Sequence, residues 1–201
     1  NNWYKGNDYH KDHGEGLDYY SVGQTLGAGD FALYRNNTIQ FTKHYRTHQI
    51  LDNGPLRTTF KLGFEPQTIE GQEISFSKTI SIDVGQNFNK VTIDFVNKHA
   101  NKTPVVVGLA KRNESKPEVE FDKDNKSVVY WEPNINDAGR TGTALILTKN
   151  KTQYIDSHEK QFLVKTEITT NKPFVYYNGA AWDKAGKITS FEQWEDAVED
   201  Y

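Results

Sequence analysis

Short apolar strands alternate with turn clusters along most of the chain, and this alternation constrains the fold more than any other feature. Segments such as EISFSKTISIDV and NKVTIDFVNK mix apolar and polar residues, whereas PVVVGLA, SVVYW and ALILT are continuous apolar runs. The first kind is typical of strands with one face in water, and the second of strands covered on both faces. Turn-forming clusters separate them. Because strands recur about every 10 to 15 residues, the sequence predicts an all-β, antiparallel β-sandwich.

The last segment, SFEQWEDAVEDY, instead has the pattern of a helix. Ser190 can cap it, and Gln193 stands where the partner in a capping box would. Three apolar residues share one face of this helix: Phe191, Trp194 and Val198. No repeat or linker-like segment divides the chain, so we expect a single β-sandwich domain over residues 1–201. The absence of Met predicts that these residues are the C-terminal portion of a longer chain with a missing N-terminal segment.

Composition excludes several classes of function. Charged residues make up 25% of the chain and nearly balance, with a formal net charge of −3, so nothing favours nucleic-acid binding. No apolar run is long enough to span a membrane. There is no Cys, which excludes disulfides and thiolate chemistry. Aromatic residues reach 13%, and their faces suit both strand packing and the apolar faces of sugar rings.

A row of basic residues lies in the segment KHYRTHQILDNGPLRTTFKL, residues 43–62. A tight turn centred on Asn53-Gly54 would pair Ile50 with Arg57 and Arg46 with Lys61. Because side chains alternate between the faces of a strand, this register predicts one shared polar face. Its members would be His44, Arg46, His48, Arg57, Thr59 and Lys61. Such a face is either simply solvated or suited to an anionic, hydroxyl-rich ligand, since Arg holds carboxylates and His moves protons.

A second group of reactive side chains lies near the start, in WYKGNDYHKDHGEGLDYYSVGQTLGAGD. Tyrosines, histidines and carboxylates alternate there with glycines, which permit the tight backbone paths of a site-forming loop. His10, His13 and Glu15 are an alternative metal-ligand set, but their spacing matches no strong metal signature. We therefore expect no metal and no other cofactor.

Two segments, DHGEGLDYYSVGQTLGAGD and HYRTHQILDNGPLRTTFKLGFEP, resemble a bacterial family of polysaccharide-utilisation loci, formerly of unknown function, that includes an ulvan oligosaccharide dehydratase. The resemblance implies a β-sandwich of the large mutarotase-like, or supersandwich, type. It also implies a periplasmic or secreted location. The implied partner is an acidic oligosaccharide that carries uronate and, in some glycans, sulfate.

The activity that the resemblance implies is loss of the C5 proton and the 4-hydroxyl, as water, from a non-reducing-end uronic acid, which gives a 4,5-unsaturated uronate. His13 or His48 would be the base and Tyr19 or Tyr20 the acid. Arg46, Arg57 or Lys61 would neutralise the carboxylate charge that grows in the transition state. Further substrate contacts are expected from His44, Glu15, Asn53 and Trp182.

Two alternatives remain open at the level of sequence. A polysaccharide lyase would use the same base and carboxylate clamp but expel a sugar oxygen. A non-catalytic glycan-binding protein would use the aromatic and basic residues only to hold the sugar.

Overall fold

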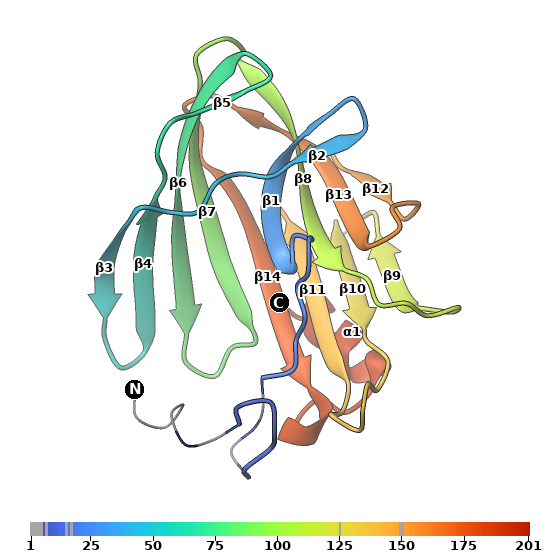
Figure 1. The fold of residues 1–201 in the computed structure, drawn as a ribbon. Helices are drawn as coiled ribbons and strands as arrows, with labels where there is room; N and C mark the ends of the chain where they lie inside the picture. Colours follow the sequence, from blue (N-terminus) through green and yellow to red (C-terminus); the bar gives the residue numbers. More distant parts are fainter. Residues whose placement is uncertain (1–5, 7, 15, 17, 125, 149–150) are drawn as a thin grey trace.

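The strands form two antiparallel sheets that pack face to face, in a computed structural model that describes residues 6, 8–14, 16, 18–124, 126–148 and 151–201 (Figure 1). The fold class predicted from the sequence is confirmed: the chain is an antiparallel β-sandwich with a short C-terminal helix. The sheets differ in width, and we call them the small sheet and the large sheet. Within each, the face turned toward the other sheet is the inner face.

The small sheet contains, in spatial order, β12 (Gln153–Ile155), β13 (Gln161–Thr169), β8 (Lys102–Ala110), β1 (Ala28–Arg35) and β2 (Thr38–Gln40). The large sheet contains, in spatial order, β3 (Thr47–Asn53), β4 (Arg57–Gly63), β6 (Gln72–Asp83), β7 (Phe88–Asn97), β14 (Phe174–Trp182), β11 (Thr141–Leu147), β10 (Ser127–Trp131) and β9 (Glu118–Asp122), with β5 (Gln67–Ile69) paired to β6. A 3-10 turn, Asp183–Ala185, follows β14.

The main core fills the space between the two inner faces. Its largest fully buried members include Phe31, Leu33, Ile93, Phe95, Leu109, Leu145, Phe162 and Tyr176. The continuous apolar run of β10 is buried on both sides, as its sequence predicts. Val128 and Tyr130 belong to this core, whereas Val129 and Trp131 face the helix on the other side of the large sheet.

The C-terminal helix α1 (Phe191–Glu199) packs on the outer face of the large sheet. The Oγ atom of Ser190 accepts a hydrogen bond from the Gln193 amide at 3.2 Å, which confirms the predicted cap. Trp194 and Val198 are buried, and the Trp194 ring stacks on Phe88 with centroids 5.3 Å apart. The helix therefore depends on its apolar stripe to stay docked on the sheet.

The large sheet extends beyond the small sheet on the side of β3 and β4, which we call the wing. Figure 1 shows these two strands at the margin of the molecule, away from β1 and β8. Ile50 lies opposite Phe60, which lies opposite Ile80 of the inner face. Ile82 is two residues after Ile80 on the same strand, so it shares that face. Ile50 and Ile82 are nevertheless 58% and 40% exposed. Part of the inner face of the large sheet is therefore open to solvent.

Candidate functional site

The N-terminal segment, residues 8–14, 16 and 18–24, forms a loop at one end of the sandwich, which we call the site loop (Figure 1). Hydrogen bonds within the loop fix its path. The Asp18 amide donates to the Tyr9 carbonyl at 3.0 Å, and Nδ1 of His10 lies 2.5 Å from the Asp18 carbonyl oxygen. Gly14 has a φ angle of 89°, in the left-handed region that favours glycine, as expected for a loop with this composition.

A buried ion pair anchors the site loop to the sandwich. Nε of Arg112 lies 2.9 Å from Oε1 of Glu132, whose side chain is only 1% exposed. The Arg112 guanidinium also lies over the Tyr20 ring, 4.6 Å from its centroid, and donates to the Ser21 carbonyl at 2.6 Å. Burial raises the pKa of Glu132, and the neighbouring Arg112 opposes that rise. Because both charges are desolvated, removing either one would leave the other uncompensated.

Tyr19 immediately precedes the anchored residue Tyr20 and faces β11. Its hydroxyl forms a hydrogen bond with Oγ1 of Thr141. Burial raises the pKa of Tyr19 above its ordinary value of 10.0, although the hydrogen bond with Thr141 opposes the shift. Tyr19 is therefore a protonated hydroxyl at neutral pH and a competent proton donor.

The site loop, the segment after β10 and the turn after β14 enclose a cavity of about 430 Å³, which we call the loop cavity. Its wall is formed by His10, Asp12, Tyr19, Ile135, Asn136, Asp137, Ala138 and Lys184. Nζ of Lys184 donates to the Asp137 carbonyl at 2.5 Å, and the Trp182 indole donates to the Ala138 carbonyl at 2.9 Å. These contacts tie the two far walls together.

Gly139 is required where the wall turns behind Ala138. Its φ angle is 92°, and a Cβ atom there would lie 2.9 Å from Nε1 of Trp182. Both the backbone conformation and the lack of space favour glycine. Gly139 therefore allows the chain to turn close to the half-buried Trp182 and form this part of the cavity wall.

The loop cavity brings together a base, an acid and a cation. The carbonyl of Asp18 can only accept a hydrogen bond, so Nδ1 of His10 donates and the neutral ring carries its lone pair on Nε2. Tyr19 supplies a hydroxyl proton, and Lys184 supplies an ammonium group. This set can remove a proton from a ligand, protonate a leaving oxygen and hold a carboxylate.

The family model described as "Domain of unknown function (DUF4861)" matches residues 1–201. The chain belongs to the DUF4861 family. This agrees with the resemblance to a family first catalogued without a function, whereas the match itself carries no information about ulvan or dehydration.

A relative and a solved structure show what this DUF4861 chain is similar to. "Uncharacterized protein P7" of Formosa agariphila is 30% identical over 211 residues, which cover all of this chain. The chain spans 52% of that relative's length. The solved structure of a "Putative kojibiose phosphorylase from human microbiome" aligns with 72% of this chain and 20% of its own, at 14% identity and a TM-score of 0.48.

The histidines and tyrosines predicted from the start of this DUF4861 chain are only partly brought together. Tyr19 lines the loop cavity, whereas the Tyr20 hydroxyl is buried beside the Arg112–Glu132 pair and faces away from solvent. Nε2 of His13 lies 2.9 Å from the Asp8 carbonyl, within the loop itself. Trp182 stands behind the cavity wall. Glu15 lies outside the described residues.

The β3–β4 hairpin has a different register from the predicted one. Ile50 lies opposite Phe60, not Arg57, and His48 lies opposite Leu62. Two features cause the shift: the register slips between Ile50 and Asp52, as at a β-bulge, and residues 54–56 form a longer connection. Pro55 cannot donate to a strand ladder, so the two-residue turn predicted at Asn53-Gly54 is wrong.

The predicted shared face of basic residues is wrong for the same reason. Arg57 and Lys61 lie on the outer face of the large sheet, where Arg57 holds Asp83 through two contacts of 2.5 and 2.7 Å and Lys61 lies 3.9 Å from Asp94. Pairing with Leu62 and Thr58 places His48 and Asn53 on the inner face instead. His44 and Arg46 precede β3, in the exposed segment that connects it to β2.

This arrangement separates the basic residues from the loop cavity. Tyr19 contacts the inner face of β11, and β3 is five strands away, about 24 Å along the sheet at the usual spacing between strands. Arg57 and Lys61 lie across the sheet from that site. His48 is on the correct face but too distant to share one sugar ring with Tyr19.

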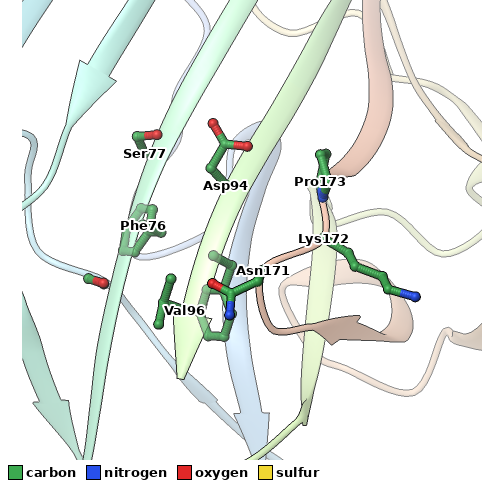
Figure 2. Close-up of a pocket in the computed structure, with 9 residues that line it drawn as sticks. Phe76, Ser77, Asp94, Val96, Asn171, Lys172 and Pro173 are labelled. Atoms are coloured by element: carbon green, nitrogen blue, oxygen red, sulfur yellow. The ribbon is translucent and has the colours of Figure 1, made fainter. Parts of the chain in front are cut away.

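A second hollow, of about 460 Å³, lies on the outer face of β6 and β7 (Figure 2). Ser77, Asp94 and Asn171 contribute its polar groups. The carboxylate of Asp94 is 3.9 Å from Lys61, and the Lys172 side chain points away from Asp94 and Ser77. No histidine or tyrosine is among the described residues of its wall, so it lacks the proton-transfer groups of the loop cavity.

The sequence does not predict three residues that form or anchor the candidate site: Lys184, Arg112 and Glu132. Each is far from the site loop along the chain, and each occurs in a segment that reads as an ordinary strand end or turn. The sequence places His10 in the site-forming loop and in an alternative metal-ligand set, but it does not single out His10 as the base. Its spacing of nine residues before Tyr19 was the available signal, but only the fold shows that both face one cavity.

Two further observations concern the part of the chain that the structure describes. It contains no cluster of three or more histidine or carboxylate side chains arranged to hold a metal ion. It also contains no helix of the length and apolarity needed to cross a membrane.

Proposed function

We propose that this chain carries a catalytic site of a carbohydrate-active dehydratase. The enzyme would eliminate water, as the C5 proton and the 4-hydroxyl, from a non-reducing-end uronic acid of an acidic oligosaccharide such as an ulvan fragment. The product would be a 4,5-unsaturated uronate. The observation that carries the proposal is the presence of His10, Tyr19 and Lys184 in the wall of one cavity of about 430 Å³.

The first step would be removal of the C5 proton by Nε2 of His10. The Asp18 carbonyl holds this ring by Nδ1, which leaves Nε2 as the basic atom. As the proton leaves, negative charge grows on the adjacent carboxylate. The Lys184 ammonium would neutralise it, because its contact with the Asp137 carbonyl uses only one of its three N–H donors.

The second step would be departure of the 4-hydroxyl, protonated by Tyr19. The C5 electron pair forms the C4–C5 double bond as the C4–O bond breaks, and the hydroxyl takes the Tyr19 proton to leave as water. The resulting phenolate regains a proton from the His10 imidazolium through solvent, which restores both groups. This assignment favours Tyr19 over Tyr20, whose hydroxyl is buried, and His10 over His13 and His48.

The rest of the proposal concerns the whole protein. A longer oligosaccharide would reach from the loop cavity across the open inner face of the large sheet, where His48 and Asn53 are available as further contacts. The resemblance to proteins of polysaccharide-utilisation loci supports a periplasmic or secreted location. The remaining half of a full-length protein such as the Formosa agariphila relative would be a structural partner of this chain.

A panel of uronate-terminated oligosaccharides tests the proposal. The conjugated double bond of the product absorbs in the ultraviolet, so absorbance and product mass are followed together. A rising signal with the loss of one water from an intact oligosaccharide supports the dehydratase. A rising signal with a shortened chain indicates a polysaccharide lyase, and binding without any signal across the panel indicates a non-catalytic glycan-binding protein.

A further inference from the structure

A separate hollow of about 570 Å³ lies beside the turn between β1 and β2, and we call it the hairpin hollow. Figure 1 shows this turn and the site loop at opposite ends of the sandwich. The hollow lies partly over the outer face of the small sheet, where Lys165 is paired with Val106 of the outer apolar cluster. It therefore shares no wall with the loop cavity.

Three cations converge on the hairpin hollow from three different strands. Arg35 comes from β1, Lys102 from β8 and Lys165 from β13. Among the described residues of the wall they are accompanied by one carboxylate, that of Glu70. Lys102 also lies 3.4 Å from Glu167, outside the wall. The wall itself thus has an excess of positive charge on rigid strands, which favours an anionic ligand.

Arg35 is held in place before any ligand arrives. Its Nη2 donates to Oε1 of Gln72, and the same oxygen accepts from Nδ2 of Asn97 at 2.9 Å. Its Nε is buried and has no hydrogen-bond partner among the described residues; the nearest carboxylate oxygen, of Glu70, is 3.9 Å away. The Arg35 side chain as a whole is 21% exposed, so an oxyanion at the wall would give the exposed part of this guanidinium a charge-assisted partner.

Pro104 supplies apolar surface to the wall of the hairpin hollow. Tyr34 also lines the hollow but is only 8% exposed, and Nζ of Lys165 lies 5.4 Å from its ring centroid, so this ring supports the Lys165 cation. Asn36 and Asn37 form the turn with φ angles of 51° and 58°, and both line the hollow. The apolar surface, the two amides and the cations together match a sugar with an anionic substituent.

We propose that the hairpin hollow is an accessory binding site for an oxyanion substituent, a sulfate ester or a carboxylate, of an acidic glycan. The site would hold a polysaccharide at a point remote from the reaction. The choice of a glycan as ligand rests on the proposed function, whereas the anion preference rests on Arg35, Lys102 and Lys165. Binding here requires no turnover, so it can be measured independently of the reaction.

The test is a binding titration of the double variant Lys102→Gln/Lys165→Gln against wild type. The probes are a sulfated neutral oligosaccharide, an unsulfated uronate oligosaccharide, a neutral oligosaccharide and inorganic sulfate. Uronate titrations use His10→Gln as the common background, which prevents consumption of the probe. Lys90→Gln/Lys187→Gln is the matched control, because it removes the same charge from exposed positions outside the hollow.

We expect an acidic oligosaccharide to bind wild type and the control equally, and to bind the double variant about tenfold or more weakly. A loss seen with the sulfated oligosaccharide identifies sulfate as the recognised group, and a loss seen with the uronate oligosaccharide identifies carboxylate. Thermal unfolding verifies that the variant is folded, and Arg35→Lys, which keeps the charge but loses the planar donor fork, provides a second test with the same expected direction.

Equal affinity of wild type and the folded double variant for every acidic probe would overturn the inference. Binding of the neutral oligosaccharide as tightly as the acidic oligosaccharides would overturn the anion preference. Binding of inorganic sulfate without binding of any acidic oligosaccharide would overturn the glycan assignment. If binding depends on these cations while no uronate substrate is turned over, the reaction proposed for the loop cavity fails and the accessory site stands.

Discussion

At the scale of single residues, the orientation of His10 decides which atom can act as a base. The Asp18 carbonyl accepts from Nδ1, so the lone pair lies on Nε2. Tyr19 is positioned by Thr141 on a strand that belongs to the core. A base on the loop and an acid held by the sheet therefore define the two sides of the proposed elimination.

Hydrogen exchange separates these two roles. In deuterated water, Tyr19→Phe retains the base but lacks the acid, so we expect it to incorporate deuterium at C5 of unreacted substrate much faster than it loses water. His10→Gln should slow both exchange and elimination. Proton magnetic resonance of the recovered oligosaccharide measures both outcomes. His99→Gln, at an exposed loop position, is the matched control, and C5 exchange that is not slowed in His10→Gln would refute the base assignment.

The pH profile tests Tyr19 as the acid. The reaction needs the protonated phenol, so activity is lost as the pH rises through the pKa of Tyr19. Because burial raises that pKa above 10.0, we expect the midpoint of the tyrosine-dependent decline in kcat/KM to lie above pH 10.0. Tyr45→Phe is the control. A decline in kcat/KM with a midpoint below pH 10.0, present in folded wild type and Tyr45→Phe but absent from Tyr19→Phe, would contradict a raised pKa of Tyr19.

At the scale of elements, the site loop depends on the buried Arg112–Glu132 pair. Arg112→Leu leaves a carboxylate that is 1% exposed without its cation, so we expect a loss of about 3–5 kcal/mol in the free energy of unfolding. The double variant Arg112→Leu/Glu132→Leu should recover most of that loss. Chemical denaturation measures both, with Lys98→Ala, from an exposed ion pair, as a control expected to change stability by about 1 kcal/mol or less.

The contact between α1 and β9 makes stability depend on pH. Glu195 faces Glu120, and burial together with this carboxyl raises the pKa of Glu195 to about 7 from its ordinary 4.5. Between these values the folded state holds more protons than the unfolded state, so the free energy of unfolding falls as the pH rises. We expect Glu120→Gln to flatten this slope and to raise the melting temperature at pH 8, as measured by calorimetry at a series of pH values.

A control variant tests whether the pH dependence of stability arises from Glu120. Glu192→Gln, also on α1, is the matched control for the removal of one carboxylate. If both variants change the melting temperature equally at every pH, the pH dependence does not arise from the Glu120–Glu195 contact.

Local patterns were sufficient for most elements but not for the hairpin at the wing. The run SVVYW coincides with β10, and the capping residues of α1 were identified correctly, because both depend on neighbouring residues. The β3–β4 register depends on a shift between Ile50 and Asp52 and on a longer turn at Pro55. A shift of one residue in register moves a side chain to the opposite face of the sheet. The basic residues of the two strands therefore do not share one face as predicted.

At the scale of the whole molecule, the candidate site is assembled from segments more than 100 residues apart. Tyr19 could be selected from its loop, but its partners Thr141 and Lys184 come from the other end of the chain. These contacts between distant segments depend on the order of strands in the large sheet. Alternating apolar and polar residues do not indicate that order. The fold class was therefore predictable from sequence, whereas the composition of the cavity was not.

The arrangement of the two sheets leaves room for the elongated ligand proposed above to contact several places. The loop cavity lies at one end of the sandwich, the wing leaves part of the inner face of the large sheet uncovered, and the hairpin hollow lies at the opposite end. A single sugar would contact one of these places, but a polysaccharide can contact several. Affinity that grows with chain length is the expected consequence.

The most direct test of the proposed elimination is the mass of the product formed from one uronate-terminated oligosaccharide by wild type, His10→Gln and Tyr19→Phe. We predict that wild type removes one water from the intact oligosaccharide. Each variant should do so about 10²–10⁴-fold more slowly, because each lacks one proton-transfer group. A shortened oligosaccharide, or water loss at the wild-type rate in both variants, would contradict elimination of water by His10 and Tyr19.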